Sequence, residues 1–395
     1  MGAKGGSRME STDQVYNKLQ RHLNNQAIGF PSTKSGAEIR ILKHIFSPEE
    51  AEIVTFLSYK FEPVNTIFKK AQAVVKSEQE LEEILERILK KGGVERKTKN
   101  AKNHYCCLPL VVGMYEFQQK NLTPEFIKDF DEYTSSKAFG VDFISTKLPQ
   151  MRTIPIKKSI YPQHNVSTYD EISALLQQSD GPFFILECIC RNKKSIEGNP
   201  CKVTNRKETC LGIGEMAGVF KEMGAARIIN KDEAISIIEE NQKEGLVLQP
   251  SNTKDIDFVC SCCGCCCGIL NMQKNLPKPL DYWTTNYFAV VNEEACEGCG
   301  KCERSCQVDA VKVVEKGKSA VVSLDRCIGC GICVSKCPTG SISLSKKSKE
   351  ISPPQTREEL LDIIAENKKG KFGKMMVTVK LIFDAVRTGQ THLLK

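Results

Sequence analysis

The sequence is poor in histidine and tryptophan, with five histidines and one tryptophan among 395 residues. So few imidazoles disfavour haem, copper and histidine-rich zinc chemistry, all of which depend on that side chain. Long apolar runs are also missing: segments such as residues 183–186 fall far short of the roughly 18 residues that a membrane span requires. Residues 1–12 have no apolar core. We therefore expect neither a signal peptide nor a membrane span.

Cysteine, in contrast, is abundant, with 20 residues. Because we expect no secretory signal, we predict a cytoplasmic protein whose thiols stay reduced, which disfavours a disulfide framework. The cysteines fall in groups, at 106–107, 188–210, 260–267, 296–306 and 327–337. Grouped thiols inside the cell indicate metal ligation. The net charge of +8 is not concentrated enough to predict nucleic-acid binding.

The region after residue 36 has the pattern of a small helical domain. Residues 47–50 form a strong helix start, with serine as N-cap followed by proline and two acids. Another helix is predicted from Ser77, and its apolar side chains recur at helical spacing: Leu81, Ile84, Leu85, Ile88 and Leu89. Two extended pieces follow, at 94–97 and 104–112. Three helices and a hairpin in this order resemble a winged helix, with 77–91 in the place of its recognition helix.

A winged helix implies DNA binding, but the charges argue against it. The outward positions of the 77–91 helix include five carboxylates: Glu78, Glu80, Glu82, Glu83 and Glu86. These would repel phosphates, whose attraction normally supplies much of the affinity for DNA. We expect a structural or protein-docking domain. In the following strand, alternation should turn one of Cys106 and Cys107 inward, as a small buried apolar side chain.

Residues 150–260 have an α/β pattern. We predict helices at 168–178, 211–223 and 231–243 and buried strands at 183–186 and 246–248. The first strand delivers Cys188 and Cys190 at its end, and the second leads by a loop to the cysteines that start at 260.

Two cysteine runs share one spacing. Residues 296–306 and 327–337 both read C-x2-C-x2-C-x3-C, with a period of 31 residues, and apolar strand-like segments follow at 310–314 and 341–344. Three thiols at this spacing wrap one side of a [4Fe–4S] cube. Glycines let such loops fold closely, and each run has two of them: Gly298, Gly300, Gly329 and Gly331. Zinc ribbons use two separated C-x2-C pairs and fit this spacing less well.

These runs resemble the bacterial two-cluster ferredoxin domain, over about 60 residues of the chain. The resemblance implies that the fourth cysteine of each run ligates the other cluster. One [4Fe–4S] cluster is then held by Cys296, Cys299, Cys302 and Cys337. The second is held by Cys327, Cys330, Cys333 and Cys306. Gln307 stands where the family usually has proline, a departure that removes no ligand.

Ten further cysteines are predicted metal ligands, because six thiols within eight residues cannot all point into a core: Cys188, Cys190, Cys201, Cys210, Cys260, Cys262, Cys263, Cys265, Cys266 and Cys267. We expect one or two more [4Fe–4S] clusters there, or zinc. The spacing leaves open whether 188–210 and 260–267 form separate sites or shared ones. Arg191 is either a solvated loop cation or a counter-charge to a cluster. Cys262-Cys263-Gly264 is similar to the CCG motif of heterodisulfide-reductase-type subunits, and 150–345 is similar to ferredoxin-fused proteins of anaerobes.

Together these patterns predict an α+β multidomain protein. The predicted parts are a flexible arm (1–36), a winged-helix-like domain (37–150), a cysteine-rich α/β domain (151–284), a two-cluster ferredoxin domain (285–346) and a basic helical tail (347–395). No catalytic triad, phosphate loop or open metal motif is apparent in the sequence. We therefore predict an electron carrier that passes single electrons to or from a larger redox enzyme. The alternatives are a reductase that acts at a cluster of the cysteine-rich domain, and a redox-sensing winged-helix regulator.

Overall fold

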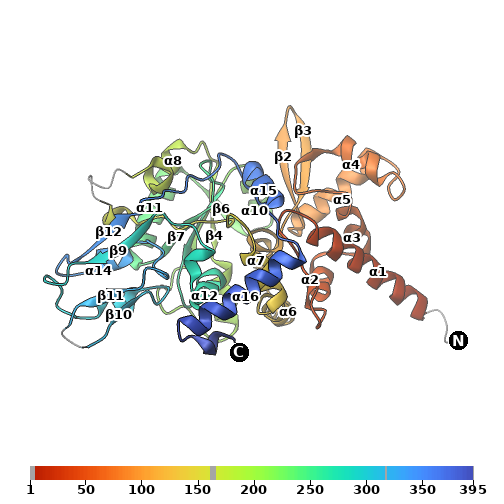
Figure 1. The fold of residues 1–395 in the computed structure, drawn as a ribbon. Helices are drawn as coiled ribbons and strands as arrows, with labels where there is room; N and C mark the ends of the chain where they lie inside the picture. The colour runs from red at the N-terminus through yellow and green to blue at the C-terminus, as the bar shows by residue number, and fades with distance from the viewer. Residues whose placement is uncertain (1–4, 161–165, 316–317, 395) are drawn as a thin grey trace. The chain divides into compact units, whose positions relative to one another are not determined.

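The computed structural model describes residues 5–160, 166–315 and 318–394 (Figure 1). The chain divides into two compact units. The first comprises residues up to 146 with 215–226 and 361–368, and the second comprises 147–214, 227–360 and 369 onward. Helices and small sheets occur throughout, which confirms the α+β class. The cysteine-rich and ferredoxin-like segments fall within the second unit.

The first unit is mainly helical. Its elements are α1 (Gly5–Asn24), α2 (Ala37–Ile45), α3 (Pro48–Val54), β1 (Glu62–Pro63), α4 (Val64–Ala71), α5 (Glu78–Lys90), β2 (Val94–Lys99), β3 (Lys102–Cys107), α6 (Pro124–Thr134), α7 (Lys137–Ile144) and α10 (Met216–Glu222).

The helix α1 lies where we expected a flexible arm. Tyr16, Leu19 and Leu23 are buried on one side of it, at the i, i+3, i+7 spacing of a core-facing stripe. The helix packs against α2 and α3. The polar composition of the segment concealed this stripe, so the expectation was wrong for residues 5–24.

The predicted helix starts at Ser47 and Ser77 are confirmed. Ser47 forms a reciprocal capping box with Glu50, and the Ser77 hydroxyl accepts from the Glu80 amide. The strands form one antiparallel sheet in the order β1-β3-β2. This element order is the one we predicted, and membership of the winged-helix family stays a prediction. Cys106 and Cys107 are both buried, because β3 is the central strand and the chain continues from it into the buried Leu108 and Leu110.

The second unit carries the cysteines. Its elements are α8 (Ile172–Gln178), β4 (Phe183–Glu187), α9 (Ile189–Ile196), β5 (Glu208–Ile213), β6 (Ala226–Ile229), α11 (Lys231–Glu244), β7 (Val247–Pro250), β8 (Phe258–Cys262), α12 (Gly268–Lys274), β9 (Tyr287–Val291), α13 (Lys301–Ser305), β10 (Val311–Val313), β11 (Ala320–Val322), α14 (Ile332–Lys336), β12 (Ile342–Lys346) and α16 (Lys371–Arg387). The helix α15 (Arg357–Glu366) begins in this unit and ends in the first.

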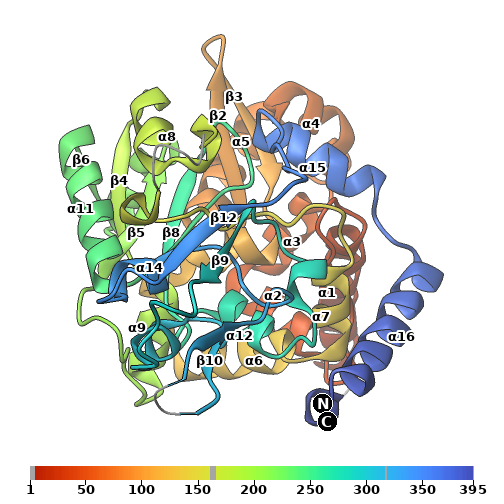
Figure 2. The same ribbon diagram turned by 60° about the vertical axis from the view of Figure 1, so that its left-hand side comes forward.

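A five-stranded sheet in the order β6-β4-β5-β8-β7 forms the core of the second unit. The helix α11 packs against β4 and β5 (Figure 2). The predicted helix at 211–223 was wrong at its start, since Leu211 and Gly212 belong to β5 and pair with Ile185 and Phe184 of β4. A side chain at Gly212 would overlap the Phe184 ring, which explains a glycine inside this strand.

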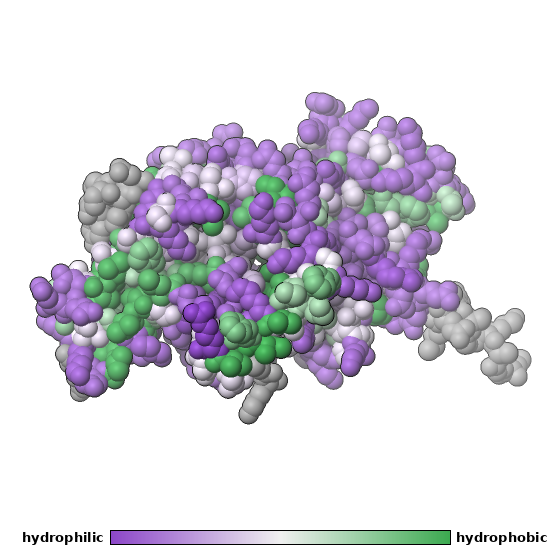
Figure 3. Space-filling model, viewed as in Figure 1, coloured by the Kyte–Doolittle hydropathy of each residue, from purple (hydrophilic) through white to green (hydrophobic). Residues whose placement is uncertain are grey.

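The strands of the ferredoxin-like segment form two antiparallel pairs, β9 with β12 and β10 with β11. The predicted strands at 310–314 and 341–344 correspond to β10 and β12. Near the end of the chain, α16 exposes apolar side chains (Figure 3), among them Phe372, Phe383 and Val386. In the described part of the chain, no helix combines the length and apolar character needed to cross a membrane.

Candidate metal centres

The two C-x2-C-x2-C-x3-C runs fold alike. Each begins as a loop with two thiols and continues into a one-turn helix, α13 or α14, which carries the third cysteine and ends at the fourth. The loop glycines all have left-handed backbones, with φ of 63° at Gly298, 72° at Gly300, 64° at Gly329 and 76° at Gly331. A side chain would be strained at each of these positions, so the glycines are required by the loop and not merely small.

Backbone amides point at the thiols of this segment. The amide of Ala289 lies 3.3 Å from Cys327 Sγ, that of Ala310 lies 3.2 Å from Cys306 Sγ, and that of Ala320 lies 3.5 Å from Cys296 Sγ. Amide donors of this kind favour the thiolate and tune the potential of a bound cluster.

The thiols of this segment differ in their surroundings. Burial raises the pKa of Cys330 and Cys333, and the charge of Cys306 raises both further. The charge of Cys302 raises the pKa of Cys333 as well, so thiols of the 296–306 run lie near the 327–333 loop. Cys299, in contrast, is exposed.

Residues 289–344 match the family model of 4Fe-4S dicluster domains. No curated protein matches the chain. The second unit therefore contains an iron–sulfur domain of the dicluster class, which supports an iron–sulfur electron-transfer role. The individual ligands stay predictions that the amide and charge relationships support.

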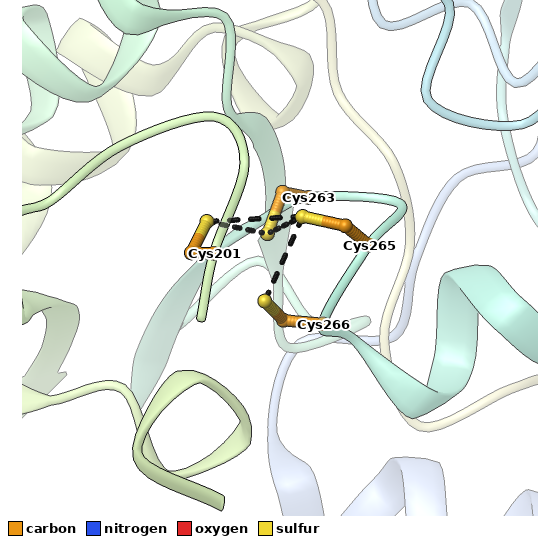
Figure 4. Close-up of side chains that lie close together, drawn as sticks. All are labelled: Cys201, Cys263, Cys265 and Cys266. Atoms are coloured by element: carbon orange, nitrogen blue, oxygen red, sulfur yellow. Dashed lines mark hydrogen bonds between the residues drawn. The ribbon is translucent and has the colours of Figure 1, made fainter. Parts of the chain in front are cut away.

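The other ten cysteines of the second unit separate into two sets in space. One set, which we call the quartet, brings together Cys201, Cys263, Cys265 and Cys266 (Figure 4). The other set, which we call the sextet, comprises Cys188, Cys190, Cys210, Cys260, Cys262 and Cys267. Each set combines thiols from both sequence groups, so the structure has the shared arrangement and not the separate one.

The order of the strands in the five-stranded sheet explains why the thiols of the sextet lie together. Cys188 follows β4, Cys210 lies on β5, and Cys260 and Cys262 lie on β8. These three strands are neighbours, and residues two apart on a strand share a face. Cys190 comes from the start of α9 and Cys267 from the start of α12. A strand at Cys260 and Cys262 was not predicted from the sequence.

The sextet thiols form a chain of contacts. Cys188 hydrogen-bonds with Cys190 and Cys210, Cys260 with Cys210 and Cys262, and Cys262 with Cys267: the members thus run in the order 190, 188, 210, 260, 262, 267. The bonds from Cys190 and Cys210 hold the pKa of Cys188 well below its usual value. The same contacts raise the pKa values of the neighbouring thiols. So many buried thiols ionise together only if bound metal supplies positive charge.

The quartet is compact. Cys263 Sγ lies 3.6 Å from Cys201 Sγ and 3.5 Å from Cys265 Sγ, and Cys265 Sγ lies 3.6 Å from Cys266 Sγ. Hydrogen bonding by the Cys266 thiol, with help from the charge of Arg191, lowers the pKa of Cys263 to about 5. These interactions favour the thiolate form of Cys263.

Arg191 is a buried counter-charge and not a solvated loop residue, since only 3% of it is exposed. Its Nη2 donates to the Ser261 carbonyl at 2.8 Å and lies 4.0 Å from Cys263 Sγ. Burial opposes its charge, but the charges of Cys188 and Cys263 more than offset this and raise its pKa. Arg191 therefore interacts with thiols of both sets, Cys188 and Cys210 of the sextet and Cys201 and Cys263 of the quartet.

Gln307 links the quartet to the dicluster domain. The Gly264 amide donates to Gln307 Oε1 at 2.7 Å. Gln307 Nε2 is 3.5 Å from the Gly245 carbonyl, next to α11. A side chain at Gly264 would collide with the Gln307 backbone. Sequence reasoning noted glutamine in place of proline but did not find this contact.

Proposed function

We propose that the protein is an electron-transfer protein in which the dicluster domain exchanges single electrons with a third iron–sulfur centre held by the sextet. The observation that carries this is the direct contact, within one unit, between the dicluster domain and the turn that joins Cys262 and Cys267 of the sextet, through the Gly264–Gln307 hydrogen bond. Gly264 adjoins the quartet, and Gln307 follows Cys306, a predicted ligand of the dicluster domain. A bound [4Fe–4S] cluster supplies reversible one-electron chemistry.

The residues present fit these groups. In the dicluster domain the proposed ligands are those that the ferredoxin resemblance implies, and the amides that face Cys296, Cys306 and Cys327 favour the thiolate forms. In the sextet, four thiols would suffice for one cube. Among the described residues, no three of its sulfur atoms lie within 4.8 Å of one another, so the sextet is spread more widely than the quartet. Arg191 offsets part of the negative charge that such a centre brings into the interior.

Electrons are proposed to enter or leave at the 296–302 loop. Cys299 is the exposed cysteine of the chain, whereas Cys327 and Cys333 are buried. An exposed ligand brings the edge of its cluster to the surface, where a redox partner protein can approach it. The buried loop at 327–333 is better suited to receive electrons from within the unit.

The test uses full-length protein purified without oxygen. We expect a low-potential one-electron donor to bleach the visible absorption of the clusters, and a viologen acceptor to restore it over repeated cycles. The reduced state should give the EPR signals of interacting [4Fe–4S] clusters. Colourless protein, or protein that bleaches irreversibly, would contradict an electron-transfer role.

A reductase is the second candidate, because the sextet has more thiols than one cube needs. The burial of Cys188, Cys262 and Cys267 weighs against substrate access. Steady turnover of a small disulfide by the reduced protein, lost in Cys188→Ser but not in Cys106→Ser, would favour the reductase. Reduction that stops after the stored electrons are spent would favour the carrier.

A further inference from the structure

The quartet has the dimensions of a site for a single metal ion. Its nearest thiol pairs are 3.5 to 3.8 Å apart, and all four sulfur atoms lie within 4.8 Å of one another. A zinc ion bound at about 2.3 Å by four thiolates has sulfur atoms at the corners of a tetrahedron with edges of about 3.8 Å. The contacts drawn in Figure 4 match these edges.

A [4Fe–4S] cube requires a wider set of thiols. It places four iron atoms between its ligands, each thiolate binding a different corner, so the sulfur atoms are held apart by the cube itself. The dicluster domain supplies an internal comparison. Across residues 5–160, 166–315 and 318–394, no other three histidine, cysteine or acidic side chains gather within 4.8 Å. The cysteines that match a cluster-binding family are therefore spread more widely than the quartet.

The local fold shows what such an ion would do. Cys201 lies between α9 and β5, in a stretch without helix or strand, while the other three thiols lie in the turn between β8 and α12. Leu246, Cys263 and Cys266 form a small buried cluster, and Cys190, Cys201, Val203 and Cys265 pack against it. So small an apolar cluster stabilises the stretch around Cys201 weakly, and an ion bound to all four thiols would fasten it to the turn.

The surroundings of the quartet support bound thiolates. The Val203 amide lies 3.4 Å from Cys201 Sγ, and Arg191 Nη2 lies 4.0 Å from Cys263 Sγ. Such donors orient metal ligands and stabilise their charge. Four thiolates around a dication leave a surplus of two negative charges, and the buried guanidinium of Arg191 offsets one of them.

We propose that Cys201, Cys263, Cys265 and Cys266 bind one zinc ion in a closed, structural four-thiolate site. Binding displaces the remaining thiol protons, and all four positions around the ion are filled by the protein. The ion then fixes the turn whose Gly264 amide meets Gln307. The proposal goes beyond electron transfer and does not depend on it, because it concerns thiols outside both the dicluster domain and the sextet.

The test measures zinc, iron and sulfide in full-length protein purified without oxygen from zinc- and iron-supplemented cells. We expect about one zinc per chain. Cys201→Ser and Cys265→Ser should lose that zinc and keep their iron and sulfide. Cys201→His should retain zinc, because imidazole replaces a thiolate in Cys₃His sites. Cys106→Ser, a buried cysteine of the first unit, is the matched control and should change neither metal.

A second readout guards against variants that fold poorly. In the wild-type protein, cobalt exchanged for zinc should give the visible ligand-field bands of a tetrahedral thiolate site, and Cys201→His should shift them. Absence of zinc, with a loss of about four iron and four sulfide in Cys201→Ser, would overturn the proposal in favour of a cube. Loss of about one iron without sulfide would overturn it in favour of mononuclear iron. If the protein binds zinc but its clusters are not reversibly reduced, the electron-transfer proposal is wrong and the zinc-site proposal stands.

Discussion

The amide of Gly264 donates a 2.7 Å hydrogen bond to the side-chain oxygen of Gln307. These residues are 43 positions apart, and each is next to a predicted metal ligand, Cys263 or Cys306. The bond joins the turn that carries three thiols of the quartet to the dicluster domain. Lys274 supports the same junction: its Nζ lies 3.3 Å from the Gly264 carbonyl and 3.7 Å from Asp309 Oδ2.

Replacing Gln307 tests whether this junction matters. Gln307→Pro removes the acceptor of the Gly264 amide but no ligand, so we expect unchanged iron and sulfide. We also expect faster hydrogen exchange at residues 263–267 and slower electron equilibration between the sextet centre and the dicluster domain. Gln307→Glu retains an acceptor oxygen and is the matched control. Equal exchange and equal electron equilibration in all three proteins would contradict a coupling role.

The crossed ligation of the dicluster domain gives a second prediction. Cys337→Ser should disturb the cluster of the exposed 296–302 loop, and Cys306→Ser should disturb the cluster of the buried 327–333 loop. The reason is that the charge of Cys306 acts on Cys330 and Cys333. EPR of the reduced variants reads out which cluster changes. The reverse pattern, with each serine affecting its own run, would rule out the crossed assignment.

Arg191 should set the potential of the sextet centre. Arg191→Met removes a buried positive charge that faces Cys188, so the reduced, more negative state of a cluster there becomes less favourable. We expect its potential to fall by roughly tens of millivolts or more. In Arg191→Lys the potential should fall less, because lysine keeps a positive charge at this position. Lys194→Met, on the same helix but paired with Glu197, is the control and should leave the potential unchanged.

A buried ion pair gives a prediction about stability. The Arg152 guanidinium donates to the Thr253 carbonyl at 2.9 Å and lies 3.7 Å from Asp170. Asp170 in turn accepts from Asn286 at 2.7 Å. Arg152→Met leaves a buried carboxylate without its cation, which should lower the free energy of unfolding by about 3 to 5 kcal/mol. Arg152→Met combined with Asp170→Asn should recover much of this. A double variant as unstable as the single one would show that the loss comes from the guanidinium hydrogen bonds instead.

The decrease in the free energy of unfolding caused by Arg152→Met should also depend on pH. Burial raises the pKa of Asp170 above its usual 3.8, and loss of the cation should raise it further. Below 3.8 the carboxyl is protonated in both folded and unfolded chains. Above it, the unfolded chain ionises more readily than the folded one, so the variant loses stability as the pH rises through the folded pKa. Urea unfolding at pH 5 and pH 8 should show the larger deficit at pH 8, and a deficit that does not change would contradict this role of Asp170.

The parts of the structure that local chemistry dictates were predictable. The caps at Ser47 and Ser77, the strand at 183–186 and the C-x2-C-x2-C-x3-C loops all depend on residues close together in sequence. Each of these patterns predicts one local structure, and the match to the dicluster family agrees with the prediction for the cysteine runs.

The partners across the sheet were not predictable. Pairing of β5 with β8 decides that Cys210 joins Cys260 rather than Cys201, and no local pattern reports strand order. The burial of Arg191 depends on the same packing. The helix α1 was missed for a different reason, because its buried stripe of Tyr16, Leu19 and Leu23 is diluted by a polar sequence.

A potentiometric titration of the anaerobic full-length protein, followed by EPR, tests the central claim most directly. We predict reversible uptake of about three electrons per chain, two by the dicluster domain and one by the sextet centre. The electron taken up by the sextet centre should be lost in Cys188→Ser, while the dicluster domain should still take up its two electrons. Uptake limited to about two electrons, and unchanged by Cys188→Ser, would contradict a redox centre in the sextet.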